Sequence, residues 1–442
     1  MSDAIGGRDL ARALRAAGWP NEGHMAQFVA SLGKVSPQDI ERCLAVVTHE
    51  SSRTDPVAHQ KRLWVFARLA ERTLDPGLFV PYVQALDAPD GPLRELLVEL
   101  LVRVNNVAGH VELCRFLAHP DSGVREACTE VINRVGVKTT FEILCRLCAD
   151  PAFTARVDAL NIMVPKARHH AVPLVQAVVQ AGRPFERYHA LGLLADVRLV
   201  PERTAEAATL AAGLVADPDE RTMALAMVAL AIHAEEGDFF DRIVPELWGD
   251  DLGRAKAAIE ALRHVAGKRT VGVLAQKLRD GPNPIRVAVI ETAEAIGTDA
   301  ILTVLVEALT CDQIGIQNHA LDAITRLAQA AKVDPARAIL WLLRNRDTRV
   351  RRAAVELLNR VGDPSGDLAP RLLKYLRDED WWVRERTMDA LIDMQWPGLG
   401  RHLVKYLRDP ADVVRHFATS ALRRIGDPAA LPTVLAAATQ GA

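Results

Sequence analysis

The chain has 442 residues, which is too long for one ordinary compact core, so several domains or an array of repeats are expected. Hydrophobic residues make up 49% of it and aromatic residues only 5%, a composition that favours helices over β-sandwich cores. The formal net charge of −2 gives no overall reason to expect nucleic acid or an anionic membrane as a partner.

The N-terminal residues carry no pattern typical of a secretion signal, because Asp3, Arg8 and Asp9 interrupt any apolar run. The longest uncharged apolar stretch, residues 222–234, is too short to span a bilayer. Six cysteines without a secretion signal indicate reduced thiols. We therefore expect a cytoplasmic, nearly all-helical protein without a membrane span.

The first 50 residues do not share the pattern that follows them. Within them, SPQDIERCLAVV (36–47) predicts a helix with Ser36 as its N-cap and Pro37 in its first turn. An open end of a repeat array needs a terminal element with a more polar outer face. We therefore predict an N-terminal helical cap over residues 1–50.

From residue 51 onward, one nine-residue pattern recurs, with a Leu eight residues before an Arg and an aliphatic residue directly before that Arg. Clear copies are LDAPDGPLR (86–94), LAHPDSGVR (117–125), LRDGPNPIR (278–286), LRNRDTRVR (343–351), LRDEDWWVR (376–384) and LRDPADVVR (407–415). The anchor positions follow at steps of 31 to 34 residues: Arg62, Arg94, Arg125, Arg156, Arg187, Arg221, Arg254, Arg286, Gln317, Arg351, Arg384 and Arg415. Twelve copies at a step near 32 residues predict a repeat array over residues 51–442.

Each copy of the pattern lies between two helical segments. In one unit, residues 367–376 predict a first helix and residues 383–394 a second helix with apolar residues at helical spacing. Unit boundaries carry VGDP (361–364) and IGDP (425–428), in which Gly can end a helix, Asp can cap the next and Pro suits its first turn. Short hairpins of this kind cannot bury both faces alone, so their stacking predicts an all-α solenoid.

An Asp six residues before the Arg, followed by x2-A-x2-A-L, resembles the HEAT repeat, particularly the short bacterial form first associated with phycobilisome lyases. The resemblance covers roughly residues 50–440 and is carried by the pairs Asp150/Arg156, Asp280/Arg286, Asp378/Arg384 and Asp409/Arg415. It implies a right-handed α-solenoid of about twelve hairpins, in which the Asp and Arg form a ladder of hydrogen bonds between neighbouring turns. Because the Arg is kept more faithfully than the Asp, we expect the ladder to be broken in the middle, around Arg221 and Gln317.

The motifs of nucleotide-binding loops, zinc hydrolases and serine hydrolases are absent from the sequence. Cys145 and Cys148 form a C-x-x-C, and Cys114 lies one repeat earlier, so a metal or redox site is one interpretation. A second C-x-x-C at zinc spacing is missing, and Cys148 occupies the core Leu position of the pattern, which favours small buried side chains. We expect no enzymatic activity, no metal and no cofactor.

Charge is distributed unevenly along the chain. From Lys332 to Ile425 there are 19 Lys and Arg against 13 Asp and Glu, whereas the rest of the chain has a net charge of −8. This basic third is either an ordinary solvated surface or a docking site for a partner with an acidic surface. Candidate contact positions are exposed ones on its second helices: Arg352, Glu356, Arg386, Asp389, His416 and Arg423.

Trp381 and Trp382 form an aromatic pair in one copy of the turn, and none of the compared copies has such a pair. One interpretation is that both rings pack against the neighbouring turns near Arg351 and Arg415, with cation–π contact. The other is that at least one ring stays exposed as a binding anchor, because Trp is enriched among interface hot spots.

An extended helical array without a deep pocket suits partners larger than metabolites. We predict a non-enzymatic scaffold or adaptor that binds a protein or peptide along the concave surface formed by its second helices. The alternative is a nucleic-acid function, similar to the alkylpurine DNA glycosylases built from similar repeats, which use Trp and Asp side chains on a basic concave face. DEDWW (378–382) invites that comparison, but those proteins are about half this length and the motif does not align further, so nucleic acid is the less favoured partner.

Overall fold

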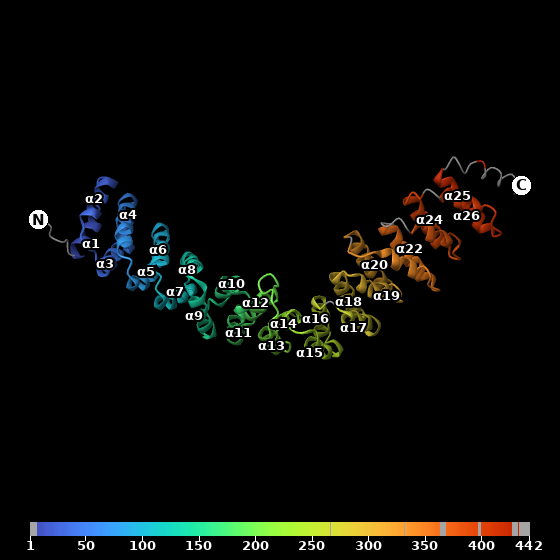
Figure 1. Cartoon of the computed structure of the whole chain (residues 1–442), viewed down its shortest axis with the longest axis horizontal. Coiled ribbons are helices and arrows are strands. Elements are labelled where there is room, and N and C mark those ends of the chain that lie inside the picture. The colour runs from blue at the N-terminus through green and yellow to red at the C-terminus, as the bar shows by residue number, and fades with distance from the viewer. Residues whose placement is uncertain are drawn as a thin grey trace. The chain divides into compact units, whose positions relative to one another are not determined.

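The computed structural model describes residues 7–265, 267–330, 332–362, 368–396 and 399–426, together with Pro432. Every regular element within these residues is a helix, which confirms the expected all-α fold. The chain forms two compact units, which are unit 1 over Met1–Ala234 and unit 2 over Glu235–Ala442. In each unit the helices follow one another in pairs joined by short turns (Figure 1).

Unit 1 begins with α1 (Gly7–Ala16) and α2 (Glu22–Ser31). Hairpins of a first and a second helix follow: α3 (Pro37–Thr48) with α4 (Pro56–Arg72), α5 (Phe79–Ala85) with α6 (Gly91–Val104), α7 (His110–Arg115) with α8 (Ser122–Val135), α9 (Val137–Ala149) with α10 (Arg156–Ala167), α11 (Val172–Ala181) with α12 (Pro184–Ala195), and α13 (Ala205–Gly213) with α14 (Glu220–His233). Short 3₁₀ helices join or extend them: η1 (Glu50–Ser52), η2 (Pro76–Leu78), η3 (Val107–Gly109), η4 (Phe116–Ala118) and η5 (Arg168–Ala171).

Unit 2 continues the same alternation of first and second helices. Its hairpins are α15 (Glu236–Trp248) with α16 (Leu252–Ala261), α17 (Lys268–Asp280) with α18 (Asn283–Ile296), α19 (Asp299–Ala308) with α20 (Ile314–Gln329), α21 (Pro335–Leu342) with α22 (Thr348–Val361), α23 (Ala369–Leu372) and η7 (Leu373–Arg377) with α24 (Trp381–Asp393), and α25 (Leu399–Tyr406) with α26 (Asp412–Ile425). The 3₁₀ helix η6 (Leu262–His264) extends α16.

Stacking of equivalent helices builds the core of each unit. In unit 1, α6 packs on α8 and α12 on α14, and in unit 2 the second helices α16, α18, α20, α22 and α24 pack on one another in that order. First helices also meet, as α7 meets α9 and α17 meets α19. Each short helix therefore buries apolar residues against its own partner and against the next hairpin, as repeat architectures require.

The anchor residues of the repeat hold the turns between first and second helices. All twelve lie in the first two turns of the second helices α4 to α26. Arg384 donates to the carbonyls of Asp378 and Glu379 at 2.6 and 3.0 Å, which satisfies acceptors that the end of the first helix leaves open. Gln317 keeps this function without the charge, since its amide donates to the carbonyl of Cys311 at 2.6 Å.

Some anchors also bind an acidic side chain of the next turn. These ion pairs are Arg94–Asp121, Arg156–Glu186, Arg187–Asp217 and Arg351–Asp378. Among the described residues, no such pair to a following turn is formed by the single anchors Arg62, Arg125 and Arg384 or by the four consecutive anchors Arg221, Arg254, Arg286 and Gln317. The longest interruption of the ladder is therefore in the middle of the chain, which confirms the expected break.

The N-terminal segment is made of helices that pack like the hairpins after it. α1 packs on α3, and α2 packs on α4. Ser36 caps α3 as predicted: its Oγ accepts from the backbone N–H of Asp39 at 3.2 Å, and the Asp39 carboxylate accepts from the N–H of Ser36 at 3.1 Å. Because α3 pairs with α4, one hairpin extends across residue 50. The division into a cap and an array at that residue stays a prediction.

The predicted first helix over residues 367–376 is shorter and divided. Its described part begins with the single α-helical turn of α23 and continues as the 3₁₀ helix η7. Gly362 and Gly426 end α22 and α26 with φ of 69° and 63°, as their place in VGDP and IGDP predicted. The Asp and Pro of both motifs lie outside the described residues.

Candidate functional site

Arginines of the preceding hairpin fix the turn that leads into α24. Arg351 of α22 donates to both carboxylate oxygens of Asp378, at 2.9 and 3.1 Å, and these two side chains are only 7% and 8% exposed. Arg352 donates to both oxygens of Asp380 at 3.1 and 2.6 Å. Asp380 also caps α24 by accepting from the N–H of Val383, and its bonds to Arg352 lower its pKa.

The two carboxylates of this turn are therefore engaged within the protein. Asp378 is buried under Arg351, and Asp380 holds both Arg352 and the first turn of α24. Neither carboxylate is free to act on a bound base, which is the role that the comparison with DNA glycosylases requires. The turn instead presents a fixed backbone on which Trp381 and Trp382 stand.

The two tryptophans have different environments. Trp381 is the first residue of α24 and is 61% exposed. Trp382 is half-buried, and the guanidinium carbon of Arg386, one turn further along the same helix, lies 5.4 Å from its ring centre. The interpretation that both rings pack against neighbouring turns does not hold for Trp381. One ring is supported by its own helix and the other faces solvent.

Exposed apolar side chains occupy the same place in other hairpins of unit 2. They are Leu252, Ile314 and Val413, which are the first or second residues of α16, α20 and α26. We call these three residues together with Trp381 the turn edge. The same place in α18 and α22 holds Asn283–Pro284 and Thr348–Arg349.

The turn edge runs along one side of unit 2 because the second helices stack in register. Adjacent packed helices lie about 8–10 Å apart, so Leu252 and Ile314, two hairpins apart, are separated by roughly 16–20 Å along the stack, as are Ile314 and Trp381. The last hairpin adjoins the one before it: the Tyr406 hydroxyl donates to the carbonyl of Leu373 at 3.3 Å. Val413 therefore lies one step beyond Trp381.

Sequence reasoning found only one part of this edge. It compared the second and third positions before the anchor for aromatic residues alone, and so singled out Trp381 and Trp382. Leu252, Ile314 and Val413 occupy the same two positions. A search of these positions for large apolar residues of any kind finds the whole row.

The other predicted contact residues lie on the surface of α22, α24 and α26, and most are bound to neighbouring charges. Arg352 binds Asp380, Glu356 binds Arg360 of its own helix at 3.1 Å, and Asp389 accepts from both Arg386 and Arg424. His416 and Arg423 are exposed and form no ion pair with another described residue. Much of the positive charge on this surface is thus neutralised within the protein, and a role of these residues in binding stays a prediction.

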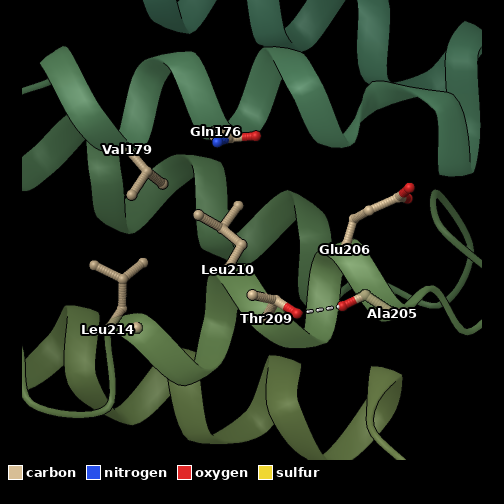
Figure 2. A pocket seen from close by; sticks show the side chains of 8 residues that line it. Gln176, Val179, Ala205, Glu206, Thr209, Leu210 and Leu214 are labelled. Carbon is tan, nitrogen blue, oxygen red and sulfur yellow. Dashed lines mark hydrogen bonds between the residues drawn. The ribbon is translucent and has the colours of Figure 1, made fainter.

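A groove of about 560 Å³ lies between the first helices α11 and α13 of unit 1 (Figure 2). It forms because α13 is built largely from Ala, Thr and Gly, which project little toward α11. Val179, Leu210 and Leu214 line it, and the Thr209 hydroxyl is engaged by the carbonyl of Ala205 at 2.8 Å. Glu206 is the one ionisable group among its lining residues, so the groove offers no pair of groups for acid–base chemistry.

A buried Ser–His–Asp grouping lies where α4 meets α6. Nδ1 of His59 is 3.4 Å from the Ser52 hydroxyl, and its Nε2 is 2.5 Å from Asp90. Ser52 is only 5% exposed, and its hydroxyl donates toward the carbonyls of Val47 and His49. This hydroxyl cannot meet a substrate as a nucleophile. The grouping links the α3–α4 loop to the N-cap of α6.

The cysteines behave as packing residues. Cys148 is fully buried, as its position in the repeat predicted, and so is Cys114. Burial raises the pKa of both thiols to about 12 and that of the half-exposed Cys145 to about 11. No cluster of His, Cys, Asp and Glu suited to a metal ion occurs in the described part of the chain.

None of the helices in the described ranges combines the length and the apolar character that a membrane span needs.

The C-terminal segment of the sequence matches a known family. Residues 304–392, 336–415 and 369–441 each match the family described as HEAT repeats. The part of the chain from residue 304 to residue 441 is therefore made of HEAT repeats. The subtype that the sequence resembled, the short bacterial form, stays a prediction, and no curated protein matches the chain.

Solved structures that match the chain include the karyopherin Kap121p. The crystal structure of Kap121p is 12% identical with a TM-score of 0.46, and the match covers 96% of this chain and 55% of Kap121p. Kap121p bound to the extreme C-terminus of the protein phosphatase Cdc14p is also 12% identical with a TM-score of 0.46, covering 94% of this chain and 53% of that one. This chain spans about half the length of the Kap121p chains that it matches.

Proposed function

We propose that this chain is a non-enzymatic scaffold that docks a protein partner along the turn edge of unit 2, with Trp381 as the main anchor. The observation that carries the proposal is the exposure of Trp381 on a turn that is held by the buried Arg351–Asp378 pair and by the Arg352–Asp380 pair. A large aromatic ring that is exposed on a fixed backbone loses little conformational freedom when it is covered. It is therefore a favourable anchor for a binding partner.

The free energy available from this ring is substantial. A Trp side chain buries about 150–250 Å² when fully covered. With 61% of the residue exposed, covering Trp381 removes on the order of 90–150 Å² from water, which corresponds to roughly 2–4 kcal/mol. The exposed parts of Ile314 and Val413 add smaller amounts at defined distances along the same edge.

The spacing of the turn edge favours an extended partner segment. An extended chain rises about 3.3 Å per residue, so the interval of roughly 16–20 Å between Ile314 and Trp381 corresponds to about five or six partner residues. The interval from Trp381 to Val413 corresponds to about three. We expect a partner segment with apolar residues at these two intervals.

The test compares three tryptophan variants of the full chain. W381A removes the proposed anchor, W382A removes the supported ring, and W341A removes an exposed ring on the first helix α21. We expect a partner isolated from cells of the source organism, then purified, to bind W381A at least tenfold more weakly than wild type, and W341A with unchanged affinity. Thermal unfolding should show W381A to be as stable as wild type and W382A to be less stable.

Equal partner affinities for W381A and wild type would remove Trp381 from the proposal. A W381A variant that unfolds at a markedly lower temperature would show that the ring serves packing. In either case the docking function assigned to the turn edge fails.

A further inference from the structure

The positive charge of the basic third is segregated onto its first helices. Residues 335–346, 368–377 and 399–408, which contain the first helices of the last three hairpins, hold nine Lys and Arg and no Asp or Glu. The other ten Lys and Arg between Lys332 and Ile425 are outnumbered by 13 Asp and Glu. The whole positive excess of this region therefore belongs to the first helices.

Most of these first-helix cations are free of ion pairs. Arg377 binds Asp409 of the next turn at 2.5 Å. Seven others are exposed and form no ion pair with another described residue: Arg344, Arg346, Arg371, Lys374, Arg401, Lys405 and Arg408. We call these seven residues the cationic face. The contrast with α22 and α24 is clear, because there Arg351, Arg352 and Arg386 are all paired.

The cationic face extends over three neighbouring hairpins. α22 packs on α24, and η7 is linked to α25 through the bond from Tyr406 to Leu373. With about 10 Å between adjacent first helices, the face measures roughly 20 Å across the helices and about 10 Å along them. It is far larger than one phosphate ion. The ring of Trp341, 55% exposed, stands on the same segment as Arg344, three residues before it.

We propose that the cationic face binds the phosphate backbone of single-stranded nucleic acid, with Trp341 as a stacking platform for a base. Three first-helix segments that hold seven unpaired cations and no acidic residue of their own are complementary to a uniform polyanion. Arginine, which makes up five of the seven, binds phosphate oxygens in a bidentate manner. An exposed aromatic ring beside a basic track is what single strands use for base stacking.

The charge of the rest of the chain favours phosphate binding at the cationic face alone. Outside the three first-helix segments the chain has 45 Lys and Arg against 56 Asp and Glu, a net charge of −11, which disfavours phosphate elsewhere. Trp341 is the one large apolar side chain of these segments that is exposed among the described residues, which is too little apolar surface for insertion into a lipid layer. The inference concerns side chains of the first-helix segments, not those of the turn edge, and does not depend on the function proposed above.

The experiment measures binding of a fluorescein-labelled 20-nucleotide single strand to the full chain by anisotropy, at several salt concentrations. The face variant is R371Q/K374Q/K405Q. The control variant is K256Q/K268Q/R423Q, which removes the same charges from exposed positions that also lack ion pairs to described residues. We expect the face variant to lose at least tenfold in affinity at low salt and to reduce the slope of log affinity against log salt by about 2, because each phosphate contact on a single strand contributes about 0.7.

The stacking role of Trp341 is tested in the same assay by comparing single-stranded and duplex nucleic acid. W341A should weaken binding of the single strand several-fold while leaving duplex of the same length nearly unaffected, and W381A should change neither. The proposal is overturned if wild type does not bind the strand at low salt, or if the control variant loses as much affinity as the face variant. It is also overturned if poly-glutamate or anionic vesicles bind to the cationic face and the strand does not.

Discussion

Replacing Arg351 by Ala tests whether the arginine pairs hold the turn edge in place. Arg351 donates three bonds to Asp378 and Glu379 and two more to the carbonyls of Asn345 and Arg346. In R351A the carboxylate of Asp378, 8% exposed, loses its cation, and breaking a buried pair in this way costs roughly 3–5 kcal/mol.

Arg352→Ala is the matched control. Arg352 binds the same turn as Arg351, through Asp380, but its side chain is 46% exposed. The carboxylate of Asp380 is 11% exposed but keeps its bond from the N–H of Val383, so the loss of this half-exposed arginine costs about 1 kcal/mol or less. Hydrogen exchange measured by mass spectrometry suits the comparison, since an array of repeats opens locally rather than all at once. Amides of α22 and α24 should exchange about a hundred- to a thousand-fold faster in R351A, and at most about fivefold faster in R352A.

The double variant R351M/D378L should restore most of the protection, because apolar groups of similar volume replace the pair and leave no buried charge. If R351A opens α24 no faster than R352A does, the buried pair does not hold this turn. The rigid support assigned to Trp381 would then be wrong.

Three further outcomes follow from the structure. Iodoacetamide at pH 8 should leave four thiols of the native chain unmodified: Cys43, Cys114, Cys128 and Cys148. Because burial raises the pKa of each thiol to about 12, we expect labelling only after denaturation. Rapid labelling of these four thiols in the native chain would contradict their packing. In denaturant unfolding, G297A should lower stability by about 1 kcal/mol, because Gly297 ends α18 with φ of 59°. G272A should raise stability by about 0.5–1 kcal/mol, because Gly272 lies inside α17 and no atom lies near its added Cβ. Equal effects of the two substitutions would refute this assignment. The bonds from Arg352 lower the pKa of Asp380, so their contribution to folding stability is present above the ordinary pKa of 3.8 and is lost as pH falls through the lowered pKa. The difference in melting temperature between wild type and R352Q should therefore vanish in acid. A difference that persists below pH 2 would contradict this assignment.

The repeat architecture could be predicted from the sequence because it rests on local patterns. The spacing of the anchors placed the second helices, and Ser36 placed the start of α3. These features depend on residues a few positions apart, which act through capping bonds and helical periodicity. The break in the arginine ladder was predicted from the same local pattern, because the Asp of the turn is kept less faithfully than the Arg.

The distribution of free charge could not be predicted in the same way. A count of residues located the basic third but not the surface that carries its excess. Arg352 and Asp380 are 28 residues apart and meet only because consecutive hairpins stack. Such pairs neutralise arginines on the second helices and leave the first-helix cations free, which no count along the chain can separate. In the same way, only the packed structure distinguishes exposed Trp381 from supported Trp382.

Site-specific photocrosslinking at position 381 tests the central claim most directly. A photoreactive phenylalanine analogue replaces Trp381 in the full chain, expressed in its own cells, and a second version carries the analogue at Lys268, an exposed position on the first helix α17 of unit 2. The account predicts that irradiation joins a discrete polypeptide to position 381 and not to position 268. A chain that forms no crosslink at 381, or that forms the same crosslinks at both positions, would contradict the proposal that the turn edge docks a protein.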